Sequence, residues 1–107
     1  MTTEEYQRLA LTRLQTVCTP WAVVIFGSRA RGDNSADADL DLLVIMETAP
    51  TDPWVLSATI RRAIGPIGIG VDVLVTDRAT WDRKRQVTGS LEGMVAREGH
   101  VVLPHAA

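Results

Sequence analysis

Three short and nearly continuous apolar runs alternate with helical patterns along this chain, and they limit the folds that it can adopt. The runs are WAVVIFG at 21–27, LLVIM at 42–46 and VDVLVT at 71–76. Each has the length of a buried strand and is far too short to span a membrane. Strands that alternate with helices are typical of an α/β fold. We therefore predict a small sheet of about four strands flanked by helices.

Capping signals indicate where the helices begin. Thr2 with Glu5 matches a capping box, and Asp52 before Pro53 matches an N-cap followed by proline at the first helical position. Pro20 ends the first helical pattern. The predicted elements are a helix over 3–17, strands at 21–27 and about 40–46, a helix from 53 that GPIGIG breaks, a strand at 71–76, two shorter helices capped by Asp77 and Ser90, the second reaching Glu98, and an edge strand at 100–103.

Composition excludes several classes of function. The 107 residues fit one compact domain, and a net charge of −2 leaves no general basic surface for nucleic acid. Cys18 is the only cysteine, so no internal disulfide forms and no Cys/His cluster suggests zinc. His100 and His105 have no partners at ligand spacing and are expected at the surface. The charged N-terminal segment does not resemble a signal peptide, so we expect a cytoplasmic protein without a membrane segment.

Alternating acids precede the second apolar run, in the stretch FGSRARGDNSADADLDLLV at 26–44. In extended backbone, residues two apart face the same side, roughly 6.5 to 7 Å apart. Asp39 and Asp41 can therefore converge on one divalent ion or hold two ions between them. Magnesium prefers oxygen ligands and commonly takes one or two carboxylates plus substrate phosphates. The alternative is a solvated acidic face at the start of a strand.

The turn before these acids has the composition of a phosphate-binding loop. Gly27 lets the backbone approach a ligand closely, and the hydroxyl of Ser28 with nearby N–H groups can hold a phosphate. Arg29 and Arg31 add permanent cationic donors that suit phosphate oxygens. The alternative is a tight turn with two solvated arginines, which leaves the closely following acids unexplained.

A third acid, Asp72, lies within the apolar run VDVLVT. A lone carboxylate among valines is costly to bury. The cost is reasonable if this strand lies beside the second one, with Asp72 near Asp39 and Asp41. Three carboxylates without a metal repel one another, and functional sites are built from such arrangements. The alternative is an edge-strand acid that points to water.

Other motifs do not match. GIGVDV has a valine at the third glycine position and precedes a strand, and no segment fits the P-loop pattern. A calcium loop is excluded because Leu42 and Thr48 stand where glycine and glutamate are required. Trp21, Trp54 and Trp81 are expected as core or partner contacts, because they are scattered and lack interleaved basic residues.

The stretch from Gly27 to Val44 resembles the signature of the nucleotidyltransferase superfamily, in which Gly-Ser and ten further residues precede Asp-x-Asp. Here Gly27-Ser28 and ten residues precede Asp39-Leu40-Asp41. GSRARG and the short length resemble the minimal nucleotidyltransferase (MNT) branch, which often supplies the antitoxin of HEPN/MNT toxin–antitoxin pairs. The resemblance implies that 1–107 is a single minimal nucleotidyltransferase domain with a mixed sheet. Ala38 departs from many relatives, which carry serine there, but the metal-binding pattern does not need that hydroxyl.

The resemblance implies Mg²⁺-dependent transfer of a nucleoside monophosphate, usually AMP from ATP, to a hydroxyl. Asp39 and Asp41 would hold two magnesium ions against the triphosphate. Asp72 would complete the metal site and accept the proton of the attacking hydroxyl. Gly27 and Ser28 would cradle the β- and γ-phosphates. Arg29 and Arg31 would stabilise charge on the leaving pyrophosphate.

The resemblance also implies a partner. Minimal nucleotidyltransferases adenylylate a tyrosine of a HEPN ribonuclease toxin and silence it, so we expect a hetero-oligomer with such a protein and no direct binding of nucleic acid. Two alternatives remain open. The chain is instead the catalytic subunit of a small-molecule nucleotidyltransferase completed by a second chain, or an antitoxin that acts by binding alone. The three acids argue against binding alone, because binding has no need of metal ligands.

Overall fold

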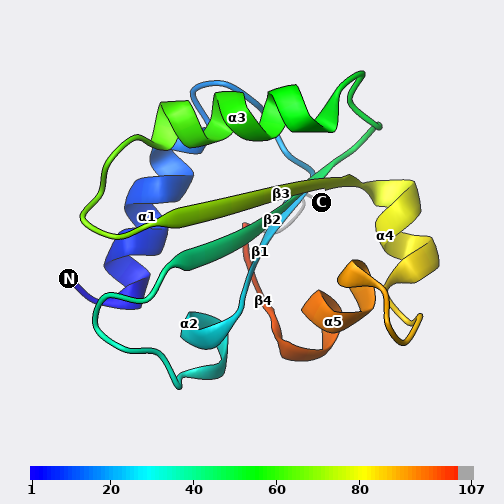
Figure 1. Cartoon of the computed structure of the whole chain (residues 1–107). Coiled ribbons are helices and arrows are strands. Elements are labelled where there is room, and N and C mark those ends of the chain that lie inside the picture. The colour runs from blue at the N-terminus through cyan, green and yellow to red at the C-terminus, as the bar shows by residue number, and fades with distance from the viewer. Residues whose placement is uncertain (104–107) are drawn as a thin grey trace.

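A computed structural model describes residues 1–103 of the protein, so that His105 lies outside the described residues. It has a four-stranded mixed sheet flanked by helices, which confirms the predicted α/β fold (Figure 1). The elements are α1 (Thr3–Leu14), β1 (Ala22–Phe26), α2 (Ser28–Arg31), β2 (Leu40–Met46), α3 (Pro53–Ile64), β3 (Val71–Asp77), α4 (Arg78–Lys84), α5 (Leu91–Glu98) and β4 (His100–Leu103).

The sheet has the strand order β3-β2-β1-β4. β1 pairs antiparallel with β2 and with β4, and β2 pairs parallel with β3. A parallel pair needs a crossover, which α3 supplies. β3 and β4 are therefore the two edge strands, as the sequence predicted for β4, and the strand that carries Asp72 lies beside the strand that carries Asp41.

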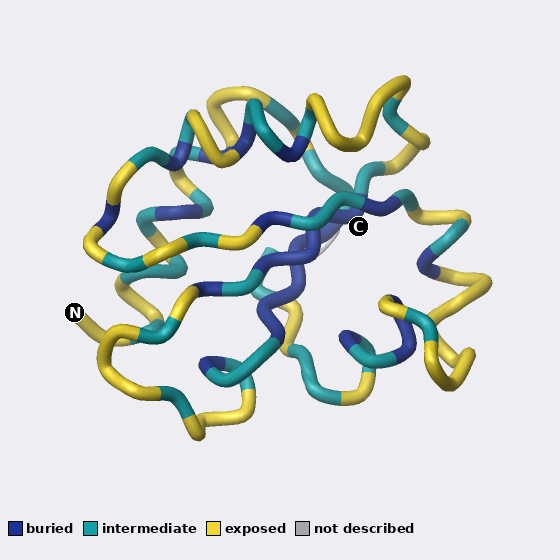
Figure 2. The backbone as a smooth tube through the Cα atoms, viewed as in Figure 1, coloured by how far each residue is buried: buried dark blue, intermediate teal, exposed yellow. Residues whose placement is uncertain are grey.

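Side chains alternate between the two faces of the sheet, and helices cover both faces. On one face, Val23, Leu42 and Val44 pack against Leu14 of α1 and Ile60 of α3. The other face packs against α4 and α5 through residues that include Val24, Phe26, Leu43, Ile45, Trp81 and Val95. Figure 2 shows the buried residues concentrated in the central strands. Because of this alternation, Asp41 and Asp72 lie on the α4/α5 face.

The predicted N-caps are confirmed, because each depends on contacts within a few residues. The side chains of Thr2, Asp52, Asp77 and Ser90 each accept a backbone N–H of the helix that follows, and Thr2 with Glu5 forms the complete capping box. Within residues 1–103, no helix has the length and apolar character needed to cross a membrane.

Two local predictions differ from the structure. The first helix ends at Leu14 and not at residue 17, because the Thr16 hydroxyl bonds the carbonyl of Arg13 (2.6 Å) and the chain tightens into a turn. The polar loop after Gly27 begins with a short helix, α2. Four residues are too few to show a helical hydrophobic period, so no local pattern predicts this helix.

Candidate active site

An acidic pair lies at the end of the sheet where β1 ends and β2 begins. Asp41 and Asp72 are direct neighbours in the parallel register of β2 and β3. Asp41 is half-buried and Asp72 is exposed at the edge. The pKa of Asp41 is raised from 3.8 to about 6, first by burial, then by the hydrogen bond with Asp72 and the negative charges of Asp72 and Asp39, while Arg31 lowers it. The prediction that Asp72 lies near Asp41 is confirmed, whereas the expected burial of Asp72 is wrong, because β3 is an edge strand and this carboxylate is exposed.

Two glycines give the acids room. A Cβ atom on Gly27 would overlap the carboxylate of Asp41, and a Cβ atom on Gly70 would overlap that of Asp39. The Leu40 N–H donates to the Gly70 carbonyl (2.9 Å), which holds the start of β2 against the residue before β3. Each carboxylate of the Asp-x-Asp motif therefore lies against a residue that has no side chain.

The third predicted acid, Asp39, lies beside this pair rather than within it. Its charge raises the pKa of Asp41, yet among residues 1–103 no three Asp, Glu, His or Cys side chains converge as a metal-ligand group. The donor set nonetheless fits a hard divalent cation, because it consists of carboxylate oxygens whose mutual repulsion a cation would relieve. Asp41 and Asp72 are the residues placed to hold it.

The Gly27-Ser28 turn leads from β1 into α2 next to Asp41. Gly27 has φ 75°, a left-handed conformation that favours glycine. The carbonyl of Gly27 accepts the N–H groups of Ala30 and Arg31, each at 3.1 Å. The Ser28 hydroxyl makes no hydrogen bond to any of the described residues, so it is available to a ligand at the turn.

Arg29 lies inside the protein rather than at the turn's open side. Its guanidinium donates to the carbonyls of Ala38 (2.9 Å) and Ala36 (3.1 Å) and to the Thr3 hydroxyl (2.9 Å). It also lies over the ring of Tyr6, 5.1 Å from the centroid. Arg29 therefore ties the loop that leads to Asp39 onto α1. This placement favours a structural role for Arg29, whereas the sequence suggested contact with pyrophosphate.

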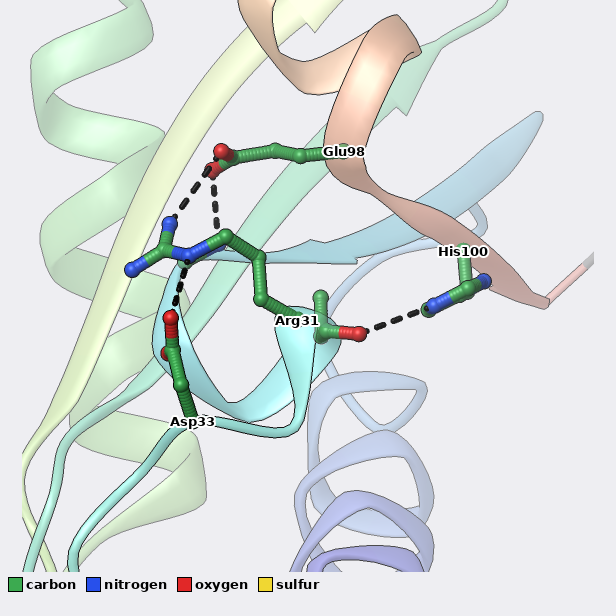
Figure 3. A network of polar contacts seen from close by, with 6 residues as sticks. Arg31, Asp33, Glu98 and His100 are labelled. Atoms are coloured by element: carbon green, nitrogen blue, oxygen red, sulfur yellow. Dashed lines mark hydrogen bonds and ion pairs between the residues drawn. The ribbon is translucent and has the colours of Figure 1, made fainter.

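Arg31 faces the site through a network at the surface (Figure 3). Its guanidinium pairs with Asp33 and with Glu98, each at 3.1 Å. The other oxygen of Glu98 accepts the Gly27 N–H (3.0 Å). Nearby, the exposed His100 contacts the Ala30 carbonyl (2.9 Å). Glu98, at the end of α5, thus links the turn to the arginine.

Alanine substitutions should distinguish the structural role of Arg29 from the surface position of Arg31. Arg29→Ala should lower the free energy of unfolding by about 2 kcal/mol, because it leaves partly buried carbonyls without their charged donor. Arg31→Ala should change the free energy of unfolding much less than Arg29→Ala does, because exposed ion pairs contribute little. Urea unfolding of both variants checks this, and equal losses would contradict the assignment.

A pocket opens beside the acidic pair, on the side of β3. Its volume is about 370 Å³, and its lining includes Asp41, Asp72, Trp54 and Arg61. Trp54 is 81% exposed and does not belong to the core, in contrast to Trp81, which is 5% exposed. The pocket gives a reacting group access to the carboxylates from solvent.

The fold and this arrangement of groups define a class of proteins, the nucleotidyltransferases, in which carboxylates at the open end of a small mixed sheet lie next to a Gly-Ser turn. The family model described as "Nucleotidyltransferase domain" matches residues 11–90. The chain therefore belongs to the nucleotidyltransferase domain family and is a transferase of nucleotidyl groups. The match contains every predicted site residue from Gly27 to Asp72 but not Glu98.

Solved structures agree with this assignment. A "putative nucleotidyltransferase" from Sulfolobus solfataricus has a TM-score of 0.63 and 19% identity, covering 91% of this chain and 76% of that chain. A "putative minimal nucleotidyltransferase" has a TM-score of 0.55 and 29% identity, covering 94% of this chain and 95% of that chain. No curated protein matches the sequence. The first likeness shows the fold alone.

Sequence reasoning missed two residues of the site, Gly70 and Glu98. Gly70 was interpreted as part of a helix-breaking segment, although its position directly before the strand that carries Asp72 was a usable signal. No sequence pattern pointed to Glu98, because its contact with Gly27 joins residues 71 positions apart. Only the packing of α5 beside β1 brings Glu98 to Gly27.

Proposed function

We propose that this protein transfers AMP from ATP to a tyrosine hydroxyl of a partner HEPN ribonuclease and thereby neutralises it as an antitoxin. The observation that carries the proposal is the acidic pair Asp41–Asp72, with a Gly-Ser turn on one side and an open pocket on the other. One side suits a triphosphate and the other an incoming acceptor. The likeness to a protein named as a minimal nucleotidyltransferase supports the short form of the enzyme.

The reaction forms one bond and breaks one. The tyrosine oxygen attacks the α-phosphorus, the bond from that phosphorus to the bridging oxygen breaks, and pyrophosphate leaves. Asp72, the exposed acid, accepts the tyrosine proton. Asp41 and Asp72, together with Asp39, would hold magnesium, which would neutralise the charge on the phosphates. Gly27 and Ser28 hold the β- and γ-phosphates, and Arg31 balances the charge on pyrophosphate.

The test is co-expression with the product of the adjacent gene, followed by the intact mass of that partner. Wild type should add one or more adenylyl groups, and Asp39→Ala with Asp41→Ala should add none. Asp37→Ala is the matched control, because Asp37 is an exposed acid of the same loop whose carboxylate accepts the Ser35 hydroxyl (3.0 Å). It should transfer as wild type does.

Two results would contradict the proposal. If the double variant still adds the adenylyl group, the acids do not carry the transfer. If no variant adds mass while the complex forms and the ribonuclease stays silent, the protein acts by binding. In the proposed setting the protein works in the cytoplasm as a hetero-oligomer with its target and does not itself bind nucleic acid.

A further inference from the structure

One row of side chains on α3 lies along the outer edge of the sheet. Trp54, Ser57 and Arg61 are three and four residues apart, so they share one side of the helix. Ser57 is buried and donates to the Val73 carbonyl of β3 (2.6 Å), which fixes this side of α3 against the edge strand. Trp54 and Arg61 flank that contact and are exposed. The helix thus presents an indole and a cation at the rim of the acidic pair.

Two cavities join into a groove along this edge. The pocket of about 370 Å³ at Asp41 and Asp72 shares Trp54 and Leu74 with a second cavity of about 310 Å³. Ser57 and Val73 also line both, and the second cavity extends to Leu91 at the start of α5. One end of the groove is acidic and reactive, and the rest is lined mainly by apolar side chains.

The order of the strands fixes which substrate this groove faces. Gly27 follows β1, Asp41 lies on β2 and Asp72 on β3, so the three lie in a row across the sheet. In phosphoryl transfer the attacking and leaving oxygens are roughly in line. If pyrophosphate leaves toward Gly27, the acceptor arrives from the side of β3. The groove lies on that side.

The lining indicates the chemistry of the acceptor. Within residues 1–103 no ion pair involves Arg61, so its charge is available to an anionic group. Trp54 and the exposed Leu91 offer apolar surface. Asp41 and Asp72 line the same pocket, but the magnesium that they would hold would offset their charge, so Arg61 is the charge left for the acceptor. A polypeptide segment can supply both an acidic and an apolar side chain. Charge complementarity therefore favours a protein.

We propose that the groove along β3 binds a segment of the acceptor protein, with an apolar side chain against Trp54 and an acidic side chain paired with Arg61, so that the acceptor hydroxyl reaches Asp72. The inference rests on the proposed transfer to a protein and adds the residues that select the acceptor. Trp54 and Arg61 are specificity-determining residues in this scheme, and neither contacts the reacting phosphate.

The experiment measures transfer to the co-expressed partner, purified, with Trp54→Ala and Arg61→Glu. Each should raise the KM for the partner about tenfold, the size expected for one contact at the centre of an interface. The affinity for a non-hydrolysable ATP analogue with magnesium should stay within twofold. Val55→Ala and Arg62→Glu are matched controls, because these exposed neighbours do not line the groove. Trp54→Phe should retain most of the activity.

A charge exchange gives the sharpest result. An acidic residue near the modified hydroxyl of the partner, replaced by lysine, should slow transfer by wild type and restore transfer by Arg61→Glu. If wild type is active and both Trp54→Ala and Arg61→Glu transfer as fast as wild type, the groove does not bind the acceptor. The proposed function would still stand in that case. A tenfold loss of affinity for the ATP analogue would also overturn acceptor binding in the groove, because the groove would then hold the nucleoside. A wild type that modifies no partner overturns the proposed function and the groove with it.

Discussion

Gly70→Ala should reduce nucleotidyl transfer by about 10- to 100-fold while the protein remains folded. The added methyl group would overlap the Asp39 carboxylate and displace it from its position beside Asp41. Changes behind a metal ligand typically cost 10- to 100-fold in affinity or activity. The backbone at Gly70 has no positive φ, so alanine brings no backbone strain there. We would measure the transfer rate against magnesium concentration and expect the midpoint to move upward.

A double-mutant cycle shows whether Gly70 acts through Asp39. In an Asp39→Ala background the overlap is gone, so Gly70→Ala should cost no further activity. Additive losses would contradict the mechanism and indicate a separate effect on β3. The melting temperature of Gly70→Ala should lie close to that of wild type, because the exposed side chain of Asp39 can move at little cost.

Asp41→Asn should abolish transfer and also make the protein more stable at pH 8. The pKa of Asp41 is about 6 in the folded chain against 3.8 for the free carboxyl, so the folded state holds this proton more tightly. Wild-type stability therefore falls as the pH rises between about 4 and 6, and the loss is complete above that window. Asparagine has nearly the same shape and never ionises, so it avoids this loss.

Melting temperatures at pH 8 and at about pH 4, in EDTA, check this prediction. The variant should melt higher than wild type at pH 8, and the difference should shrink at the lower pH. Asp37→Asn, in the exposed loop, should leave the melting temperature at pH 8 unchanged. A variant that is less stable than wild type at pH 8 would show that the acidic pair stabilises the fold.

The features that could be predicted from the sequence are those set by local chemistry or by alternation. N-caps such as Thr2 and Asp52 act within a few residues, and short apolar runs identify the strands. The proximity of Asp41 and Asp72 followed from an acid in an otherwise apolar strand, which needs a reason to be there. The caps and the strands required no knowledge of long-range packing, whereas the proximity of the two acids was a hypothesis about how two strands pair.

The features that escaped prediction depend on contacts between distant segments. Arg29 and Arg31 look alike in GSRARG, yet Arg29 is buried against the ring of Tyr6 and Arg31 is exposed beside Glu98. The direction of each side chain depends on where α1 and α5 pack. Gly70 matters only because β3 places it beside Asp39. A single sequence carries no local sign of such neighbours.

The parallel crossover has a consequence for how the protein folds. β1 and β2 are close in the sequence and can pair early, whereas β2 and β3 meet only after the chain has closed a loop through α3. Long-range pairings of this kind are slow, because the entropy of loop closure is lost before contacts compensate for it. By this argument the two acids come together after β1 and β2 have paired. Any partly folded form in which β2 and β3 have not yet paired has Asp41 in its strand but lacks the neighbouring Asp72, and is therefore unable to react.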